Sequence, residues 1–288
     1  MAARSTPETD SLSPCGRIAR DLDRDRYLTA VIAPPEIREA LFALYAFNVE
    51  VAKTREMVSE PMMGQIRLQW WRDSIDGIYE GNERRHEVVT PLGEAVRRHG
   101  LDRDGFLRII DSRERDLADA PPTTLAELER YADDSAGTLL LQALRIAAPG
   151  SPDEAEKAAR GIGAAWALIG IARAVPFLAQ SRSTLLPDDL VAEARVDKGL
   201  LWELKPHPGL FRAVEILCAK ASERLRAARA VRRDIPKPAL PVLRSTAILD
   251  SHLRVLRRAG HNPFDARVVL GSPLRQWRLM VYALSGRY

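Results

Sequence analysis

The chain has few of the residues that build disulfide frameworks, zinc sites or export signals. Only two cysteines, Cys15 and Cys218, occur among 288 residues, and they are far apart in sequence. No Cys-x-x-Cys pair and no Cys/His cluster is present, so neither a disulfide framework nor a structural zinc site is indicated. The N-terminal stretch contains acidic residues and no apolar segment, which disfavours a secretory signal peptide. These absences favour a reducing compartment.

Long apolar runs and strand-like alternation are also scarce. We find no apolar run that approaches the roughly 18 residues needed to span a membrane. Helical periodicity, in contrast, recurs along almost the whole chain, and the apolar fraction of 46% can supply a substantial core. The sequence therefore predicts an all-α protein, with a flexible tail over residues 1–16 and a single domain over 17–288.

The basic residues do not indicate a nucleic-acid-binding protein. The formal net charge is +4, and the arginines alternate with acidic residues in stretches such as "RDLDRDR". Such alternation is typical of solvated helix faces. Because no aromatic stacking pattern, RNP motif or zinc finger accompanies the arginines, we do not expect nucleic acid as a partner.

Apolar spacing of three and four residues predicts the positions of the helices. Thr123 or Thr124 is expected to cap one of them, with Glu127 at capping-box distance from Thr124. Pro176 is expected to break or kink another. The principal helices are predicted over residues 35–58, 61–81, 91–98, 101–117, 124–146, 152–175, 207–232, 239–258 and 272–285.

Four segments in this order resemble one enzyme family. They read "YLTAVIAPPEIREALFALYAF", "LQWWRDSIDGIYEG", "YADDSAGTLLL" and "STLLPDDL", and together they extend from Tyr27 to Leu190. Their order and spacing are similar to those of the squalene/phytoene synthase family. The resemblance implies the helical isoprenoid synthase fold around a central cavity. In active members of that family, two aspartate-rich helices hold Mg²⁺ against a prenyl diphosphate, because the leaving diphosphate needs cations to neutralise its charge.

The carboxylates that the resemblance implies are mostly missing from this chain. The family pattern places them at positions 52, 56, 174 and 178, where this sequence has Ala52, Glu56, Ala174 and Leu178. A clamp that retains only Glu56 should not hold magnesium. In addition, Asp25 stands where the family usually has a small hydroxyl residue, and its charge would repel a diphosphate. We therefore expect no catalytic residues, no metal and no cofactor.

A narrower resemblance includes these altered positions. The segments "AFNVEVAKTRE", "GQIRLQWWRDSIDGIY" and "DSRERDL" are similar to a non-catalytic branch of the family, which contains a mitochondrial assembly factor for respiratory complex I. The resemblance implies an assembly role with a protein client, such as a peripheral-arm subunit of NADH dehydrogenase. The expected location is the bacterial cytoplasm, or the mitochondrial matrix if the source is eukaryotic. Peripheral contact with the inner membrane stays open.

Four residues are candidates for a residual pocket: Tyr45, Glu56, Asp116 and Arg173. For Glu56 and Arg173 the sequence favours ion pairs over a ligand-binding role. The histidines show no metal-ligand spacing and are expected in loops or near helix ends. They are His86, His99, His207, His252 and His261.

Two other functions remain as alternatives. One is a prenyl-diphosphate condensing transferase with an unusual metal site, and the other is an isoprenoid-binding protein without catalysis. Small residues at cavity positions, Ala52, Gly163, Gly170 and Ala174, leave room for an isoprenoid ligand.

Overall fold

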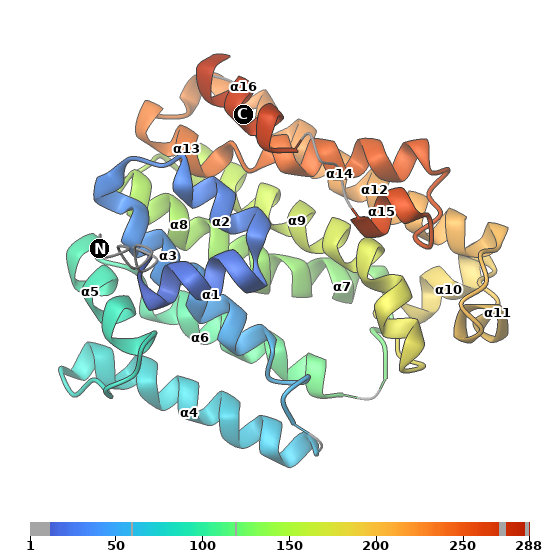
Figure 1. Ribbon diagram of the computed structural model, residues 1–288, viewed down its shortest axis with the longest axis horizontal. Helices are drawn as coiled ribbons and strands as arrows, with labels where there is room; N and C mark the ends of the chain where they lie inside the picture. The colour runs from blue at the N-terminus through green and yellow to red at the C-terminus, as the bar shows by residue number, and fades with distance from the viewer. Residues whose placement is uncertain (1–11, 59, 119, 271–274, 286–287) are drawn as a thin grey trace, which may run out of the picture.

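The computed structural model is a bundle of α-helices arranged around the long helix α9, Asp153–Gln180 (Figure 1). It describes residues 12–58, 60–118, 120–270, 275–285 and 288, and these residues contain no β-strand. The predicted all-α class is confirmed. The other helices are α1 Pro14–Leu22, α2 Arg24–Val31, α3 Pro35–Ala52, α4 Pro61–Glu80, α5 Val89–His99, α6 Arg103–Ser112, α7 Leu125–Ala132, α8 Thr138–Ala147, α10 Asp188–Ala194, α11 Lys198–Trp202, α12 Pro208–Ala230, α13 Leu240–Leu243, α14 Thr246–Arg258, α15 Ala266–Leu270 and α16 Arg275–Ser285. Short 3₁₀ turns (η1 Arg113–Leu117, η3 Arg232–Asp234 and η4 Lys237–Ala239) and one π-helix (η2 Asp133–Gly137) connect them.

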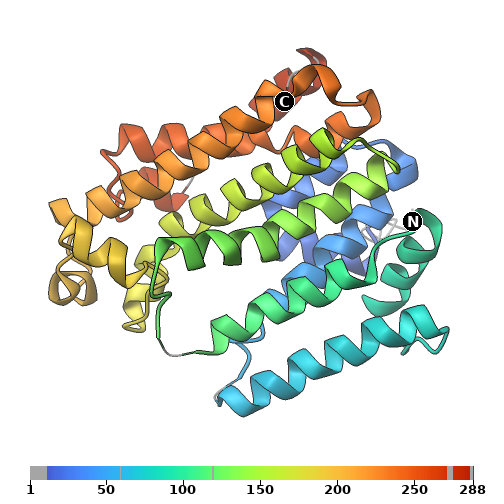
Figure 2. The same ribbon diagram turned by 180° about the vertical axis from the view of Figure 1, so that it is seen from behind.

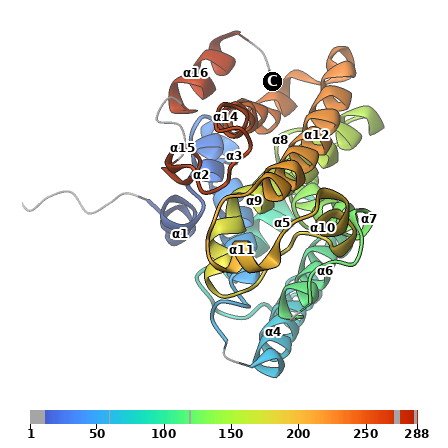
Figure 3. The same cartoon turned by 90° about the vertical axis from the view of Figure 1, so that its right-hand side faces the viewer.

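Helix α9 packs against α12, α8, α7 and the π-helix η2. Helices α4 and α16 lie at opposite edges of the bundle, in the view from the side (Figure 3) and from behind (Figure 2). Small residues of α9 allow close approach. A Cβ built on Gly163 would come within 2.1 Å of the carbonyl oxygen of Ala136 in η2. Glycine at position 163 therefore lets the π-helix lie directly against α9.

Helix α3 forms the other half of the core. Nearly all of its residues from Leu41 to Val51 are buried, as expected for a helix that is apolar around most of its circumference. Phe47 of α3 makes edge-to-face contacts with Trp71 of α4 and Phe106 of α6, at ring-centroid distances of 5.4 and 5.3 Å. These contacts fix α4 and α6 against α3.

Several helix boundaries differ from the prediction, among them these three. Residues 1–11 lie outside the described residues, but α1 already begins at Pro14, inside the predicted tail, with Cys15 buried. Helix α3 ends at Ala52 instead of continuing to 58, because the chain tightens and the amide of Thr54 donates to the carbonyl of Val51. Helix α9 is not broken at Pro176 and continues to Gln180.

One helix passes the length and composition test for a membrane span, contrary to the sequence expectation. Helix α9 is long and apolar enough to cross a bilayer by those two criteria alone. Residues 161–179 contain a single charged side chain, Arg173. The expectation that the chain has no apolar run of this length is therefore wrong. In the bundle, 61% of the most apolar window of α9 is buried. Its surroundings are thus those of the core helix of a helical bundle.

Candidate functional site

A cavity of about 340 Å³ lies between α3 and α9, at the position that the sequence analysis singled out. The junction of α1 and α2, the turn after α3, the 3₁₀ turn η1, helix α7 and the π-helix η2 complete its walls. The lining residues are Leu22, Asp23, Arg26, Asn48, Val49, Ala52, Lys53, Glu56, Arg113, Tyr131, Ser135, Ala136, Ala167, Gly170, Ile171 and Ala174.

Ala52 and Ala174 line this cavity from two different helices, as predicted. Ala52 is the last residue of α3. Ala174 lies one turn after Gly170 and two turns after Ala167, so the three residues share one face of α9. All of these side chains are small, and the cavity stays open at the point where the family pattern would place carboxylates.

A buried hydrogen-bonded group forms the polar wall of the cavity. The guanidinium of Arg113 donates to the hydroxyl of Tyr131 at 2.6 Å and to Asp116 at 3.3 Å. The Tyr131 hydroxyl in turn donates to Asp116 at 2.9 Å, and Arg113 also lies 3.4 Å from the amide oxygen of Asn48. Asp116 and Arg113 have side-chain exposures of only 16% and 13%, so their opposite charges compensate each other in a largely dry environment.

Burial and charge set the protonation of this group. Burial raises the pKa of the Tyr131 hydroxyl, although the charge of Arg113 acts in the opposite direction, so Tyr131 stays neutral at physiological pH. Burial alone would lower the pKa of Arg113, but Tyr131 and Asp116 more than offset it, and the net shift is upward. The cavity therefore contains a permanent cation that is already neutralised by Asp116.

The remaining charges at the cavity leave little capacity for a metal. Asp23 accepts a hydrogen bond from the backbone of Arg26 at 3.2 Å and pairs with its guanidinium at 2.5 Å. Arg26 also lies over the ring of Trp166, 4.7 Å from its centroid. Lys53 is half-buried, whereas Glu56 is exposed. Neither Lys53 nor Glu56 forms an ion pair with another residue in the part of the chain that the structure describes.

The donor set at this site does not fit a magnesium cluster. Mg²⁺ prefers carboxylate oxygens in near-octahedral geometry, whereas the walls offer Ala52, Ala174 and an ion-paired Asp23. Glu56 follows the end of α3 in a turn, so it does not share a helix face with position 52. Within the described residues, no group of three His, Cys, Asp or Glu side chains is arranged to hold a metal ion.

The four residues proposed as a residual pocket are placed differently from one another. Glu56 lines the cavity, and among the described residues no arginine pairs with it as the sequence favoured. Asp116 lies behind the lining and holds Arg113 and Tyr131. Tyr45 is not among the described lining residues; it is buried, and burial raises its pKa to about 12. Arg173 is also absent from the described lining and contacts His252 instead.

Sequence analysis missed a buried polar cluster beside the cavity. His252 of α14 lies 2.8 Å from Asp25 of α2 and 3.4 Å from Arg173 of α9. With Asp25 ionised, the imidazole Nε2 is the donor to its carboxylate. The expectation for His252 is therefore wrong, because this residue is in the interior of a helix. Asp25 contacts His252 and is not among the described residues that line the cavity. The apolar stripe of Ile248 and Leu256, which includes position 252, could have identified His252 as buried.

Comparisons with known proteins found a matching family model and several relatives. The family model described as squalene/phytoene synthase matches residues 19–278. A curated protein of Bos taurus, named NADH dehydrogenase (ubiquinone) complex I, assembly factor 6, is 31% identical over 275 residues, which cover 95% of this chain and 82% of that protein. The protein of the same name from Homo sapiens is 31% identical over 251 residues, with 87% and 75% coverage.

A solved enzyme structure shares this fold. A crystal structure of a dehydrosqualene synthase in complex with ligand superposes with a TM-score of 0.82 and covers 94% of both chains. Its sequence identity to this chain is only 19%, so the likeness is one of fold. The predicted isoprenoid synthase fold is confirmed.

Proposed function

This chain belongs to the squalene/phytoene synthase family, and we propose that it acts as an assembly factor for respiratory complex I and does not catalyse the family's condensation reaction. The observation that supports the proposal is the cavity itself, which Ala52 and Ala174 line at positions where the family pattern implies metal-binding carboxylates. The assembly role is inferred from relatives that carry the assembly-factor name and are about 30% identical to this chain.

The charges at the cavity support the loss of the reaction. Ionisation of an allylic diphosphate requires cations that neutralise the leaving group. Arg26 and Arg113 are the cationic arginines of the lining, and each is already paired with a carboxylate. Lys53 alone cannot replace a cluster of divalent ions. We infer that a fold retained without the reaction is under selection for a surface that binds another protein.

The partner that we infer is a protein client, a peripheral-arm subunit of NADH dehydrogenase before it docks. In a bacterium this would place the protein in the cytoplasm, on the same side of the membrane as the peripheral arm. In a eukaryote the corresponding compartment is the mitochondrial matrix. An assembly factor of this kind binds transiently and is absent from the finished complex.

A second candidate function is the binding of an isoprenoid without turnover. The cavity remains open at about 340 Å³, near the lower limit of small-molecule sites, and three small residues, Ala167, Gly170 and Ala174, line its α9 wall together with Ile171. Titration with farnesyl diphosphate in the absence of Mg²⁺, followed by calorimetry, distinguishes a ligand-binding cavity from an unused one.

Two experiments test the proposal. The purified protein, incubated with Mg²⁺ and labelled farnesyl or geranylgeranyl diphosphate, should release no diphosphate above a control without protein. A tagged copy expressed from its own promoter should co-purify a peripheral-arm subunit from cells that are assembling complex I, and should be missing from the mature complex. Clear turnover, or recovery of no subunit of the complex, would refute it.

A further inference from the structure

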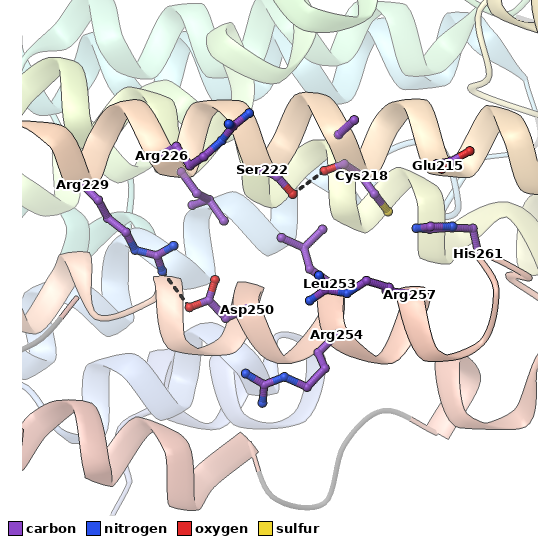
Figure 4. A pocket seen from close by; sticks show the side chains of 12 residues that line it. Glu215, Cys218, Ser222, Arg226, Arg229, Asp250, Leu253, Arg254, Arg257 and His261 are labelled. Atoms are coloured by element: carbon purple, nitrogen blue, oxygen red, sulfur yellow. Dashed lines mark hydrogen bonds and ion pairs between the residues drawn. The ribbon is translucent and has the colours of Figure 1, made fainter.

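A second cavity of about 340 Å³ runs between α12 and α14 (Figure 4). We call it the α12–α14 groove. Arginines dominate its rim: Arg226 and Arg229 come from α12, and Arg254 and Arg257 come from α14. No residue of this groove belongs to the lining of the cavity between α3 and α9, so it is a separate feature of the surface.

The two acidic residues of the groove are already engaged. Asp250 accepts a hydrogen bond from Arg229 at 2.7 Å and another from the hydroxyl of Tyr282 at 2.8 Å. Glu215 pairs with Arg212 at 3.1 Å. Figure 4 shows Arg229 extending across from α12 to Asp250 of α14. Both carboxylates are thus neutralised by arginines.

Three arginine charges remain uncompensated. Arg226, Arg254 and Arg257 form no ion pair with another residue of the described chain. His261 closes one end of the groove, and partial burial lowers its pKa, so it adds no positive charge at neutral pH. The permanent excess of guanidinium groups favours an anionic occupant, and guanidinium groups pair well with carboxylates in a bidentate geometry.

The floor of the groove is apolar and its shape is elongated. Cys218 and Leu225 are buried beneath it, with exposures of 6% and 1%, and Leu253 contributes from α14. In Figure 4 the uncompensated arginines are spread along both helices and do not converge on one point. A single phosphate needs converging donors, and a bilayer surface cannot enter a groove between two helices. A peptide with several carboxylates and an apolar side chain fits the spread arginines of the rim and the apolar floor.

We propose that the α12–α14 groove binds an acidic segment of a protein partner, with its carboxylates on Arg226, Arg254 and Arg257. The inference rests on the proposed function in one respect, that the occupant is a segment of a client protein. Charged rim contacts of this kind mainly raise the association rate and specificity, and they weaken as salt screens them.

The test uses the full-length protein and a short fluorescein-labelled peptide of glutamate and leucine, with binding followed by anisotropy. A peptide in which glutamine replaces every glutamate is the probe control. The groove variant is Arg226→Ala/Arg254→Ala/Arg257→Ala. A matched variant, Arg85→Ala/Arg98→Ala/Arg130→Ala, removes the same charge from exposed arginines elsewhere on the surface. Circular dichroism confirms that each variant is folded.

The groove variant should bind the acidic peptide about tenfold more weakly than the unmodified protein, whereas the matched variant should retain its affinity. Equal loss in both variants, or no preference for glutamate over glutamine, would overturn the inference. Binding to vesicles of anionic phospholipid without binding to the peptide would overturn it in favour of a membrane surface. The assay contains no respiratory complex, so its failure rejects the groove alone, whereas a failure to co-purify any complex I subunit rejects the assembly role alone.

Discussion

Ala52 at the end of α3 and Ala174 on α9 line the same cavity, the positions where the family pattern implies metal-binding carboxylates. Small apolar side chains therefore line the cavity at these two positions. Helix α3 also ends at Ala52, so the turn that contains Glu56 lies outside the helix. Both the residue types and the local backbone differ from what a two-sided magnesium clamp requires.

Reintroduction of carboxylates should not restore the reaction. In the variant Ala52→Asp/Ala174→Asp/Leu178→Asp, the new residue 52 would share no helix face with Glu56, because the helix ends between them. Leu178, moreover, is not among the described residues that line the cavity. We expect no Mg²⁺-dependent release of diphosphate from farnesyl diphosphate. Turnover above that of the unmodified protein would contradict the claim that residue 52 and Glu56 cannot bind a metal ion together.

Two glycines of α9 should respond in opposite ways to alanine. In Gly163→Ala the new Cβ would meet the backbone of Ala136 at 2.1 Å, so we expect a loss of about 1 to 3 kcal/mol in the free energy of unfolding. A Cβ on Gly170 meets nothing within 4 Å, and Gly170→Ala should be neutral or stabilising by up to about 1 kcal/mol. Denaturant unfolding measures both. Equal effects of the two substitutions would refute the close contact with the π-helix.

The buried network of the cavity wall should be sensitive to the loss of its carboxylate. Asp116→Asn leaves the guanidinium of Arg113 uncompensated in a buried position, and we expect a loss of about 3 kcal/mol in stability. Asp111→Asn serves as the control, because Asp111 pairs with Arg72 at the surface and is 58% exposed. Its loss should cost less than about 1 kcal/mol. A small effect of Asp116→Asn would show that Arg113 is solvated in solution.

The two thiols should be inert in the native protein. Burial raises the pKa of Cys15 and of Cys218 to about 12, so both stay protonated far above neutral pH. Because only the thiolate attacks, an aromatic disulfide reagent at about pH 8 should titrate neither thiol before unfolding and both thiols in guanidinium chloride. Reactivity should increase with pH as the thiolate fraction rises. Rapid reaction of Cys218 in the native state would show that the floor of the α12–α14 groove opens.

Much of the fold could be predicted from the sequence, because apolar periodicity is strong in helices such as α5 and α14. The placement of Ala52 and Ala174 followed from the family pattern. Local patterns could not predict the end of α3, where tertiary burial of Thr54 decides the backbone path. The same holds for Pro176, since the buried neighbours Val175 and Ala179 stabilise a continuous helix despite the proline.

The polar cluster of Asp25, Arg173 and His252 was beyond sequence reasoning for a related reason. Its members come from α2, α9 and α14, which are separated by up to 227 positions in the chain. Periodicity shows which residues share a face of one helix, but it does not show which helices are neighbours. The arginines of the α12–α14 groove are spread over two helices in the same way.

The most direct test of the account is deletion of the gene in its source organism, with NADH:quinone activity and isoprenoid lipids measured in the same membranes. Loss of assembled complex I and of its activity, with normal isoprenoid lipids and rescue by a plasmid copy, is the predicted result. Normal complex I together with altered isoprenoid lipids would contradict the assembly role and show that the family reaction persists.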